Sequence, residues 1–179
     1  LNDGTASPFS GVSGSDVSAD AHDTRSVALG DVDGDGDLDL VAGNNGQANR
    51  LYLNDGTASP FSGVSGSDVS PDAHWTNSVA LGDVDGDGDL DLVTGNWNQA
   101  NRLYLNDGTA SPFSGVSGSD VSADAHDTRS VALGDVDGDG DLDLVAGNNG
   151  QANRLYLNDG TASPFSGVSG SDVSADAHD

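Results

Sequence analysis

The chain has 179 residues and carries 30 acidic side chains against five arginines and no lysine, which gives a formal charge of −25 at pH 7. Such a charge argues against nucleic acid as a partner, and against anionic membrane surfaces and membrane insertion; no apolar run approaches the ~18 residues that a membrane-spanning helix needs. There is no cysteine and therefore no disulfide. The apolar residues form short runs bounded by Gly, Asn, Asp and Ser, which is typical of short strands between turns.

The sequence repeats itself with a period of 52 residues. The stretch LNDGTASPFSGVSGSDVS begins at Leu1, Leu53, Leu105 and Leu157, and the copies are identical apart from a few positions in the middle unit. A repeat of this length indicates a tandem array of one supersecondary unit. We divide the chain into a leading part-unit, which supplies a strand end and a fourth strand, and three full units that we expect to be blades: 1–23, 24–75, 76–127 and 128–179.

Each full unit is expected to contain four strands joined by turn residues. In the first full unit they are predicted at 25–32, 38–43, 49–54 and 60–65. A four-stranded unit repeated every ~40–50 residues is typical of a β-propeller blade, and a solenoid is the competing architecture. The predicted fold is therefore all-β: a β-propeller of four-stranded antiparallel blades, with three blades and an extra N-terminal strand segment in this chain.

An acidic stretch, DVDGDGDLDL, lies between the first two predicted strands of every unit, at 31–40, 83–92 and 135–144. Two carboxylates this close repel each other by roughly 1 kcal/mol in water and by about 4 kcal/mol at an effective dielectric near 20. Aspartates occupy positions 1, 3, 5, 7 and 9 of the loop and Gly36 occupies position 6, much as in the first half of an EF-hand loop. This spacing predicts a bound cation that offsets the repulsion.

The loops offer only hard oxygen ligands, which favours calcium over magnesium or manganese and does not suit zinc. We expect about three Ca²⁺ ions per chain, one joining the first two strands of each blade; an acidic turn kept for solubility is the alternative. The predicted metal-binding residues are Asp31, Asp33, Asp35, Asp37, Asp39, Asp83, Asp85, Asp87, Asp89, Asp91, Asp135, Asp137, Asp139, Asp141 and Asp143.

The two tryptophans of the chain flank the first two predicted strands of the middle unit. Trp75 precedes its first predicted strand and Trp97 follows the second, so an antiparallel hairpin brings them together at the end opposite the acidic loop. Aromatic rings flanked by amides suit a glycan, because ring faces stack on sugar C–H surfaces. The alternative is that the rings pack on each other or on a neighbouring chain. The predicted ligand-binding residues are Trp75, Trp97, His74, Asn77 and Asn98.

The remaining polar and aromatic residues are interpreted as structural. No nucleophile–base set or phosphate-binding loop is present, so the chain is not expected to be an enzyme. The histidines recur in one context before the first strand, and the arginines beside the tyrosines are expected to pair with the neighbouring blade. The phenylalanines of the predicted fourth strands are expected in the core: Phe9, Phe61, Phe113 and Phe165.

The stretch ALGDVDGDGDLDLVAGN, followed by NRLYLNDGTASPF, resembles the FG-GAP/VCBS repeat, the blade of integrin-α-like propellers and of some propeller lectins. The resemblance covers essentially the whole chain. It implies a seven-bladed calcium-binding propeller of a secreted or surface protein that adheres to partners or binds glycans. Two departures stand out: three blades cannot close a ring, and the FG-GAP dipeptides are absent, with FSG at 61–63 only a partial echo.

These observations predict a calcium-stabilised binding module located outside the cell or at its surface, either carbohydrate-binding or adhesive. Its partners would be a glycan or a surface protein, and the chain would form a homo-oligomer or part of a longer repeat chain. The alternative is a structural repeat of a surface protein or a self-assembling fibre with no small-molecule ligand.

Overall fold

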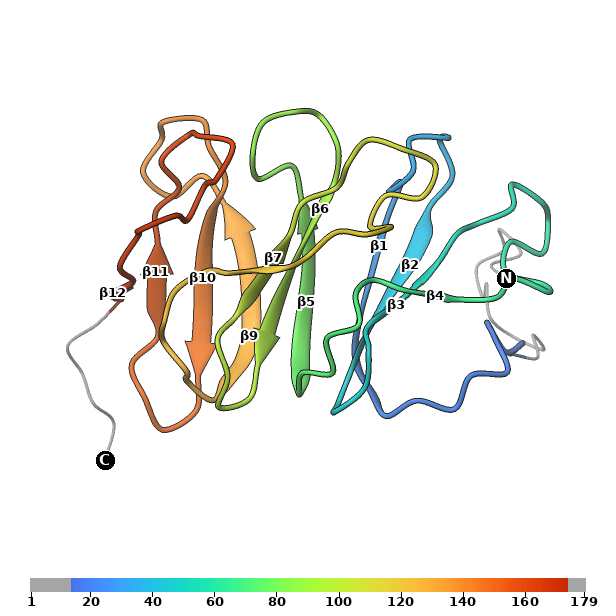
Figure 1. The fold of residues 1–179 in the computed structure, drawn as a ribbon, viewed down its shortest axis with the longest axis horizontal. Coiled ribbons are helices and arrows are strands. Elements are labelled where there is room, and N and C mark those ends of the chain that lie inside the picture. The colour runs from blue at the N-terminus through green and yellow to red at the C-terminus, as the bar shows by residue number, and fades with distance from the viewer. Residues whose placement is uncertain (1–13, 174–179) are drawn as a thin grey trace, which may run out of the picture.

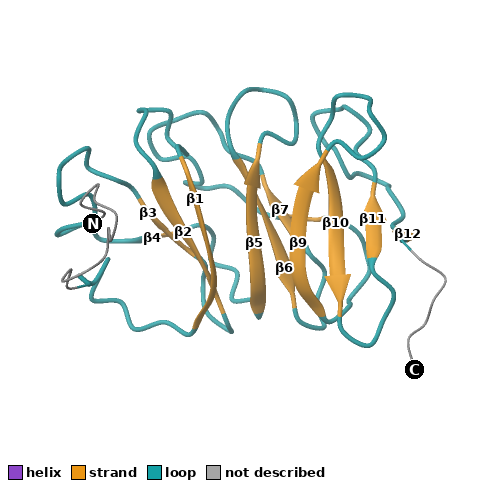
Figure 2. Ribbon diagram, turned by 180° about the vertical axis from the view of Figure 1, so that it is seen from behind, coloured by secondary structure: helices purple, strands orange, loops and turns teal. Residues whose placement is uncertain are grey.

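The computed structural model describes residues 14–173, which form three four-stranded antiparallel sheets and no helix. The sheets stand side by side as three blades and leave the ring open (Figures 1 and 2). The strands are β1 (Thr24–Gly30), β2 (Asp39–Asn44), β3 (Arg50–Tyr52), β4 (Ser67–Asp68), β5 (Thr76–Gly82), β6 (Asp91–Asn96), β7 (Arg102–Tyr104), β8 (Ser119–Asp120), β9 (Thr128–Gly134), β10 (Asp143–Asn148), β11 (Arg154–Tyr156) and β12 (Ser171–Asp172). The all-β fold with four-stranded antiparallel blades is confirmed.

Each blade is a meander in which sequential strands pair, so blade 1 has the order β1-β2-β3-β4 and blades 2 and 3 repeat it. In blade 1, Val27 lies opposite Ala42 and Gly30 opposite Asp39. This register places the acidic loop at one end of the β1–β2 hairpin and the start of β1 with the end of β2 at the other. The two ends of each blade are therefore chemically different surfaces.

The hydrophobic core lies between the blades rather than within one of them, because a single sheet has to bury its faces against another element. Two clusters fill the two spaces. The cluster between blades 1 and 2 contains Val32, Val41, Leu51, Val69, Val79, Leu92, Tyr104 and Phe113. The cluster between blades 2 and 3 contains Val84, Val93, Leu103, Val121, Val131, Leu144, Ala146, Tyr156 and Phe165.

The prediction for the fourth strand is wrong. The segment 60–65 forms two consecutive turns, in which Ser62 N donates to Ser59 O at 2.8 Å and Val64 N to Phe61 O at 3.2 Å. Turn chemistry decides this segment, because it begins with a proline and contains a glycine at a φ of 80°. The fourth strand comes later and is only two residues long, Ser67–Asp68.

The phenylalanines reach the core from this turn instead of from a strand. Phe113 and Phe165 are each 3% exposed and belong to the clusters between blades, whereas Phe61 is only partly buried. Phe9, His178 and the predicted N-terminal strand lie outside the described residues. From residue 14 to residue 23 the chain forms no strand. No helix of the described chain is long and apolar enough to span a membrane.

Candidate functional site

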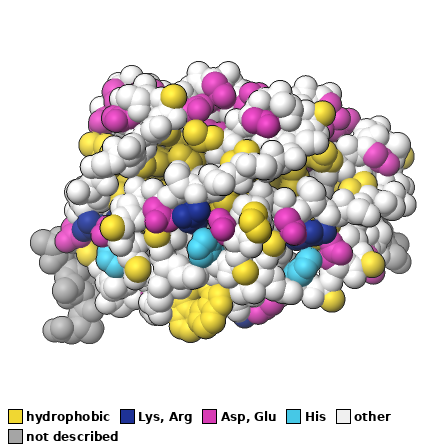
Figure 3. Space-filling view, viewed as in Figure 1, with side chains coloured by type: hydrophobic (Ala, Val, Ile, Leu, Met, Phe, Trp, Pro, Cys, Tyr) yellow, Lys and Arg dark blue, Asp and Glu magenta, His cyan; other side chains and the backbone are white. Residues whose placement is uncertain are grey.

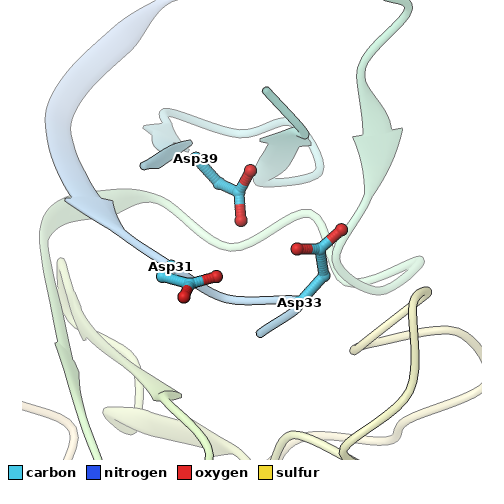
Figure 4. A group of neighbouring side chains, drawn as sticks. All are labelled: Asp31, Asp33 and Asp39. Carbon is cyan, nitrogen blue, oxygen red and sulfur yellow. The ribbon is translucent and has the colours of Figure 1, made fainter. Parts of the chain in front are cut away.

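Each acidic loop gathers three carboxylates around a common point. In blade 1 these are Asp31 and Asp33 from the loop and Asp39 from the start of β2, each with one oxygen within 4.8 Å of the others (Figure 4). The same three loop positions, 1, 3 and 9, meet in the other blades. The three trios are Asp31–Asp33–Asp39, Asp83–Asp85–Asp91 and Asp135–Asp137–Asp143.

The aspartate at position 9 is fully buried and joins three segments of its blade. In blade 1, Asp39 Oδ2 accepts a hydrogen bond from Val32 N at 2.9 Å, and its Oδ1 accepts one from Asn54 N at 2.8 Å. These two bonds tie the loop and the end of the third strand to the start of β2. Blades 2 and 3 repeat them through Asp91 and Asp143.

The rest of the loop is folded by its own carboxylates. Asp31 Oδ2 accepts from Gly36 N at 3.0 Å, and Asp35 Oδ1 accepts from Asp37 N at 2.9 Å. Gly36 has a φ of 94°, in the left-handed region that favours glycine. Asp35 and Asp37, predicted as ligands at positions 5 and 7, are not members of the trio. The carboxylate of Asp37 instead lies beside Gly56 in the turn after β3.

The electrostatics of the trios favour a cation. Burial, followed by the nearby charges of Asp39 and Asp35, raises the pKa of Asp33, and burial also raises the pKa of Asp85 and Asp137. Burial raises the pKa of Asp91 to about 6. Among residues 14–173, no ion pair involves a trio member, and the buried Asp31 Oδ1 has no hydrogen-bond partner. An oxygen-only site with uncompensated charge fits calcium.

The opposite end of the middle blade carries the two tryptophans. Their rings stack with centroids 4.4 Å apart and an interplanar angle of 25°, and Trp97 N donates to Trp75 O at 2.9 Å. Trp75 is 44% exposed and Trp97 36%, so the stack still presents aromatic surface to solvent. Figure 3 shows acidic side chains gathered over the upper end of the molecule, where the loops lie, and a hydrophobic patch at the lower end.

The tryptophans occupy the centre of a row of six positions that crosses all three blades, which we call the end row. Main-chain hydrogen bonds and bridges join successive members across and between blades. In the outer blades a side-chain hydrogen bond takes the place of the stack: Asn45 Nδ2 donates to Asp23 Oδ2 at 3.1 Å, and Asn149 Nδ2 to Asp127 Oδ2 at 2.9 Å. The members in order are Asp23, Asn45, Trp75, Trp97, Asp127 and Asn149.

The other predicted ligand residues have different surroundings. Asn77 Nδ2 donates to Thr128 O of blade 3 at 2.8 Å, so one of its polar groups serves the contact between blades. His74 is half-buried; its carbonyl accepts from Gly46 N at 3.0 Å, and its Nδ1 has no partner among the described residues. Asn98 is exposed beside Trp97 with a φ of 51°.

Sequence reasoning missed the structural role of the asparagine in LYLN. Asn106 N donates to Asp91 Oδ1 at 2.8 Å, and Asn106 Nδ2 donates to Val32 O of blade 1, also at 2.8 Å. One residue thus touches the acidic site of its own blade and the main chain of the preceding blade. Its repetition at the same place in every unit was the available signal.

Comparison with known proteins places these features in context. The family model described as FG-GAP-like repeat matches residues 31–94 and 83–146. Cartilage acidic protein 1 of Mus musculus is 29% identical over 140 residues, and its Homo sapiens counterpart is 29% identical over 138. The Xenopus tropicalis protein of the same name is 28% identical over 138 residues. The aligned parts cover 74% of this chain and 21% of each relative, so the chain spans about a fifth of their length.

Proposed function

The chain belongs to the FG-GAP-like repeat family, and on that basis we propose that it is a calcium-stabilised, non-enzymatic binding module acting outside the cell or at its surface. The observation that carries the proposal is the recurrence of one oxygen-only carboxylate trio in all three blades. Three identical sites inside hairpins suit repeated parts of a scaffold better than a catalytic centre.

Calcium would be held by the trios, completed by the aspartate at position 5 and by the main-chain carbonyl at position 7. A bound ion supplies the positive charge that the crowded carboxylates lack and so stabilises the first hairpin of each blade. Calcium sites of extracellular modules have Kd values of order 10⁻⁴–10⁻³ M and are filled by extracellular calcium. Sites of this affinity in the present chain would be filled outside the cell.

The ligand that we propose is a carbohydrate, placed against the tryptophan pair. The rings remain exposed after stacking, and the end row sets polar groups on both sides of them. Aromatic faces bind the C–H faces of sugars while neighbouring amides orient hydroxyls. In this proposal Asn98 and Asn77 contact hydroxyl groups, and His74, next to Trp75 in the chain, helps to hold the platform.

The test uses residues that the chain already carries at the equivalent places. The double variant Trp75→Asp/Trp97→Asn converts the middle blade to the Asp–Asn pair of the outer blades. We expect loss of retention on a glycan array with cooperative thermal unfolding and the calcium stoichiometry retained. Equal retention by the variant and the parent chain would contradict the carbohydrate site, and a parent chain that binds no glycan would contradict the carbohydrate proposal as a whole.

A second candidate function is a structural repeat of a surface protein or fibre with no small-molecule ligand. The near-identity of the units favours it, because a scaffold needs no distinctive site. Under this alternative, calcium would still raise the melting temperature, but the double tryptophan variant would alter assembly instead of glycan retention. Native mass spectrometry of both chains in calcium separates the two functions.

A further inference from the structure

The two contacts between neighbouring blades have the same construction, which we call the seam. In the first seam, Val79 and Leu81 of β5 pack against glycines of blade 1. A Cβ on Gly43 would lie 2.7 Å from Val79 Cγ1, and one on Gly30 would lie 2.9 Å from Leu81 Cδ1. The second seam repeats both contacts: Gly95 lies against Val131, and Gly82 against Leu133. The absence of side chains on these glycines is what allows the next blade to approach.

Three polar links also recur in both seams. A main-chain N–H of the following blade donates to a serine hydroxyl of the preceding one, as Val79 N does to Ser26 Oγ at 3.2 Å. An asparagine amide donates to a valine carbonyl, as Asn106 Nδ2 does to Val32 O. Gly46 N donates to His74 O at 3.0 Å. The second seam contains the corresponding bonds Val131 N to Ser78 Oγ, Asn158 Nδ2 to Val84 O and Asn98 N to His126 O.

The two outermost faces of the described chain are the two halves of one further seam. On blade 1, Val27 and Leu29 are each 60% exposed and Leu38 is 56% exposed, whereas Val79 at the equivalent place in blade 2 is 8% exposed. On blade 3, a Cβ on Gly134 would meet nothing within 4 Å, and Val136 is 56% exposed although its equivalents Val32 and Val84 are 3% exposed. One face presents the protruding side chains and the other presents the receiving glycines.

We infer that these faces bind each other between two copies of the chain, so that blade 3 of one copy and blade 1 of another form a third seam. The polar groups match as well as the apolar ones. Val27 N faces Ser130 Oγ of the second copy, Asn54 Nδ2 faces its Val136 carbonyl, and Gly150 N of the second copy faces the His22 carbonyl. The two seams within the chain thus indicate, residue by residue, which groups of the second copy pair with those of the first.

Blade number indicates how such a contact would close. The joint is heterologous, because two different faces meet, and heterologous joints form closed rings when their rotation closes. Two copies supply six blades, within the typical range of 4–8 blades for a propeller, whereas three copies exceed that range. For the 179-residue chain by itself, we therefore assign a ring of two copies with two new seams. The formal charge of −25 on each copy opposes association, so filled calcium sites and moderate salt favour it.

Residues 14–23 already hold one side of this joint. Asp20 Oδ2 accepts from Tyr52 OH at 3.1 Å and from Arg50 Nη2 at 3.2 Å, as Asp72 does for Tyr104 and Arg102 of blade 2. The stretch 16–23 has the same sequence, DVSADAHD, as 172–179. In the described chain, the copy at 16–23 occupies the place against Arg50.

The inference is tested by sedimentation velocity and native mass spectrometry of the 179-residue chain in calcium, over a range of concentrations. We expect a discrete species of two copies. Leu29→Lys places a charge in the seam from one side, and Gly134→Ile fills the receiving space from the other, where the free chain has room for it. Each variant is expected to weaken dimerisation by at least ~10-fold, since both leave unfavourable groups in an apolar contact.

Mixing the two variants gives the sharpest result. A heterologous joint leaves one intact seam in the mixed pair, so the mixture recovers a dimer that neither variant forms alone. The exposed-turn variant Ser114→Ile, on neither end face, serves as the matched control and stays dimeric. The inference is overturned if the parent chain remains a monomer, if it forms an open-ended ladder, or if the mixture shows no recovery while both variants keep the parent's circular dichroism spectrum.

Discussion

The two ends of the blades differ in how far their residues repeat: one end has the same residues in every blade, and the other has a distinctive pair in the middle blade only. At the loop end, all three blades present the same carboxylate trio, and the aspartate at position 9 makes the same two main-chain hydrogen bonds each time. At the other end, the end row holds a hydrogen-bonded Asp–Asn pair in the outer blades and a stacked tryptophan pair in the middle blade. An array of near-identical units can therefore carry one distinctive site without disturbing its common framework.

Calcium removal is expected to have the largest effect, and it acts only on the loop end. At 10 mM calcium and a Kd near 10⁻⁴ M, each filled site adds about 2.7 kcal/mol to the free energy of unfolding. Chelation should therefore lower the melting temperature strongly, as followed by differential scanning calorimetry, with about three ions released per chain. An unchanged melting temperature would contradict the assignment of the acidic loops as calcium sites.

Asp91→Asn is expected to be the most damaging single substitution at this end. The carboxylate is fully buried and accepts hydrogen bonds from Val84 N and Asn106 N, and the amide can accept only through its one oxygen. We expect the free energy of unfolding to fall by about 1–3 kcal/mol in urea titrations, because a buried donor is left unpaired. Part of the loss should persist after chelation, because the unpaired donor remains although the buried charge is gone; a loss seen only with calcium would mean that ligation is this residue's sole role.

The pH dependence of stability should change sign with calcium. Burial raises the pKa of Asp91 to about 6, above the ~3.9 of an aspartate in an unfolded chain. Without calcium, the stability contributed by the protonated form is present below pH ~4 and is lost as the pH rises through about 6. With calcium, the ion requires the carboxylate, so stability rises over the same window. Urea midpoints between pH 4 and 7 measure both slopes, and parallel slopes would contradict the assignment.

At the tryptophan end the expected effects on stability are smaller. Trp97→Asn alone breaks the stack and should cost about 1 kcal/mol, since aromatic pairs contribute ~0.5–1.5 kcal/mol beyond their burial. The double variant Trp75→Asp/Trp97→Asn should cost less than the sum of the single variants, because the new pair can form the hydrogen bond seen between Asn45 and Asp23. A double-mutant cycle measures this coupling, and strictly additive costs would show that the two rings do not support each other.

Thr94→Val should give the smallest change and should be stabilising. Thr94 is fully buried in β6, and its hydroxyl has no hydrogen-bond partner among the described residues. Valine keeps the shape and removes the unsatisfied group, which we expect to add about 0.5 kcal/mol to the free energy of unfolding. Thermal melts of the two chains in calcium measure the difference. A destabilised variant would indicate that the hydroxyl binds an ordered water.

Several features could be predicted because they depend on local sequence. The period located the units, the turn residues located the first three strands of each blade, and the antiparallel hairpin was enough to bring Trp75 and Trp97 to one place. The fourth strand could not be located in the same way. Its two residues pair with β3 only because the turn at 59–64 has already set the direction of the chain. The local sequence PFSGV is equally compatible with a strand and with a turn.

The sequence by itself determined the repeat, the all-β class and the spacing of the acidic loops, because each depends on residues close together along the chain. Only the tertiary structure decided which three of the five loop carboxylates meet, which glycines admit the next blade, and which faces remain uncovered. These depend on how far one sheet approaches another, and that distance is set by side chains separated by a whole repeat.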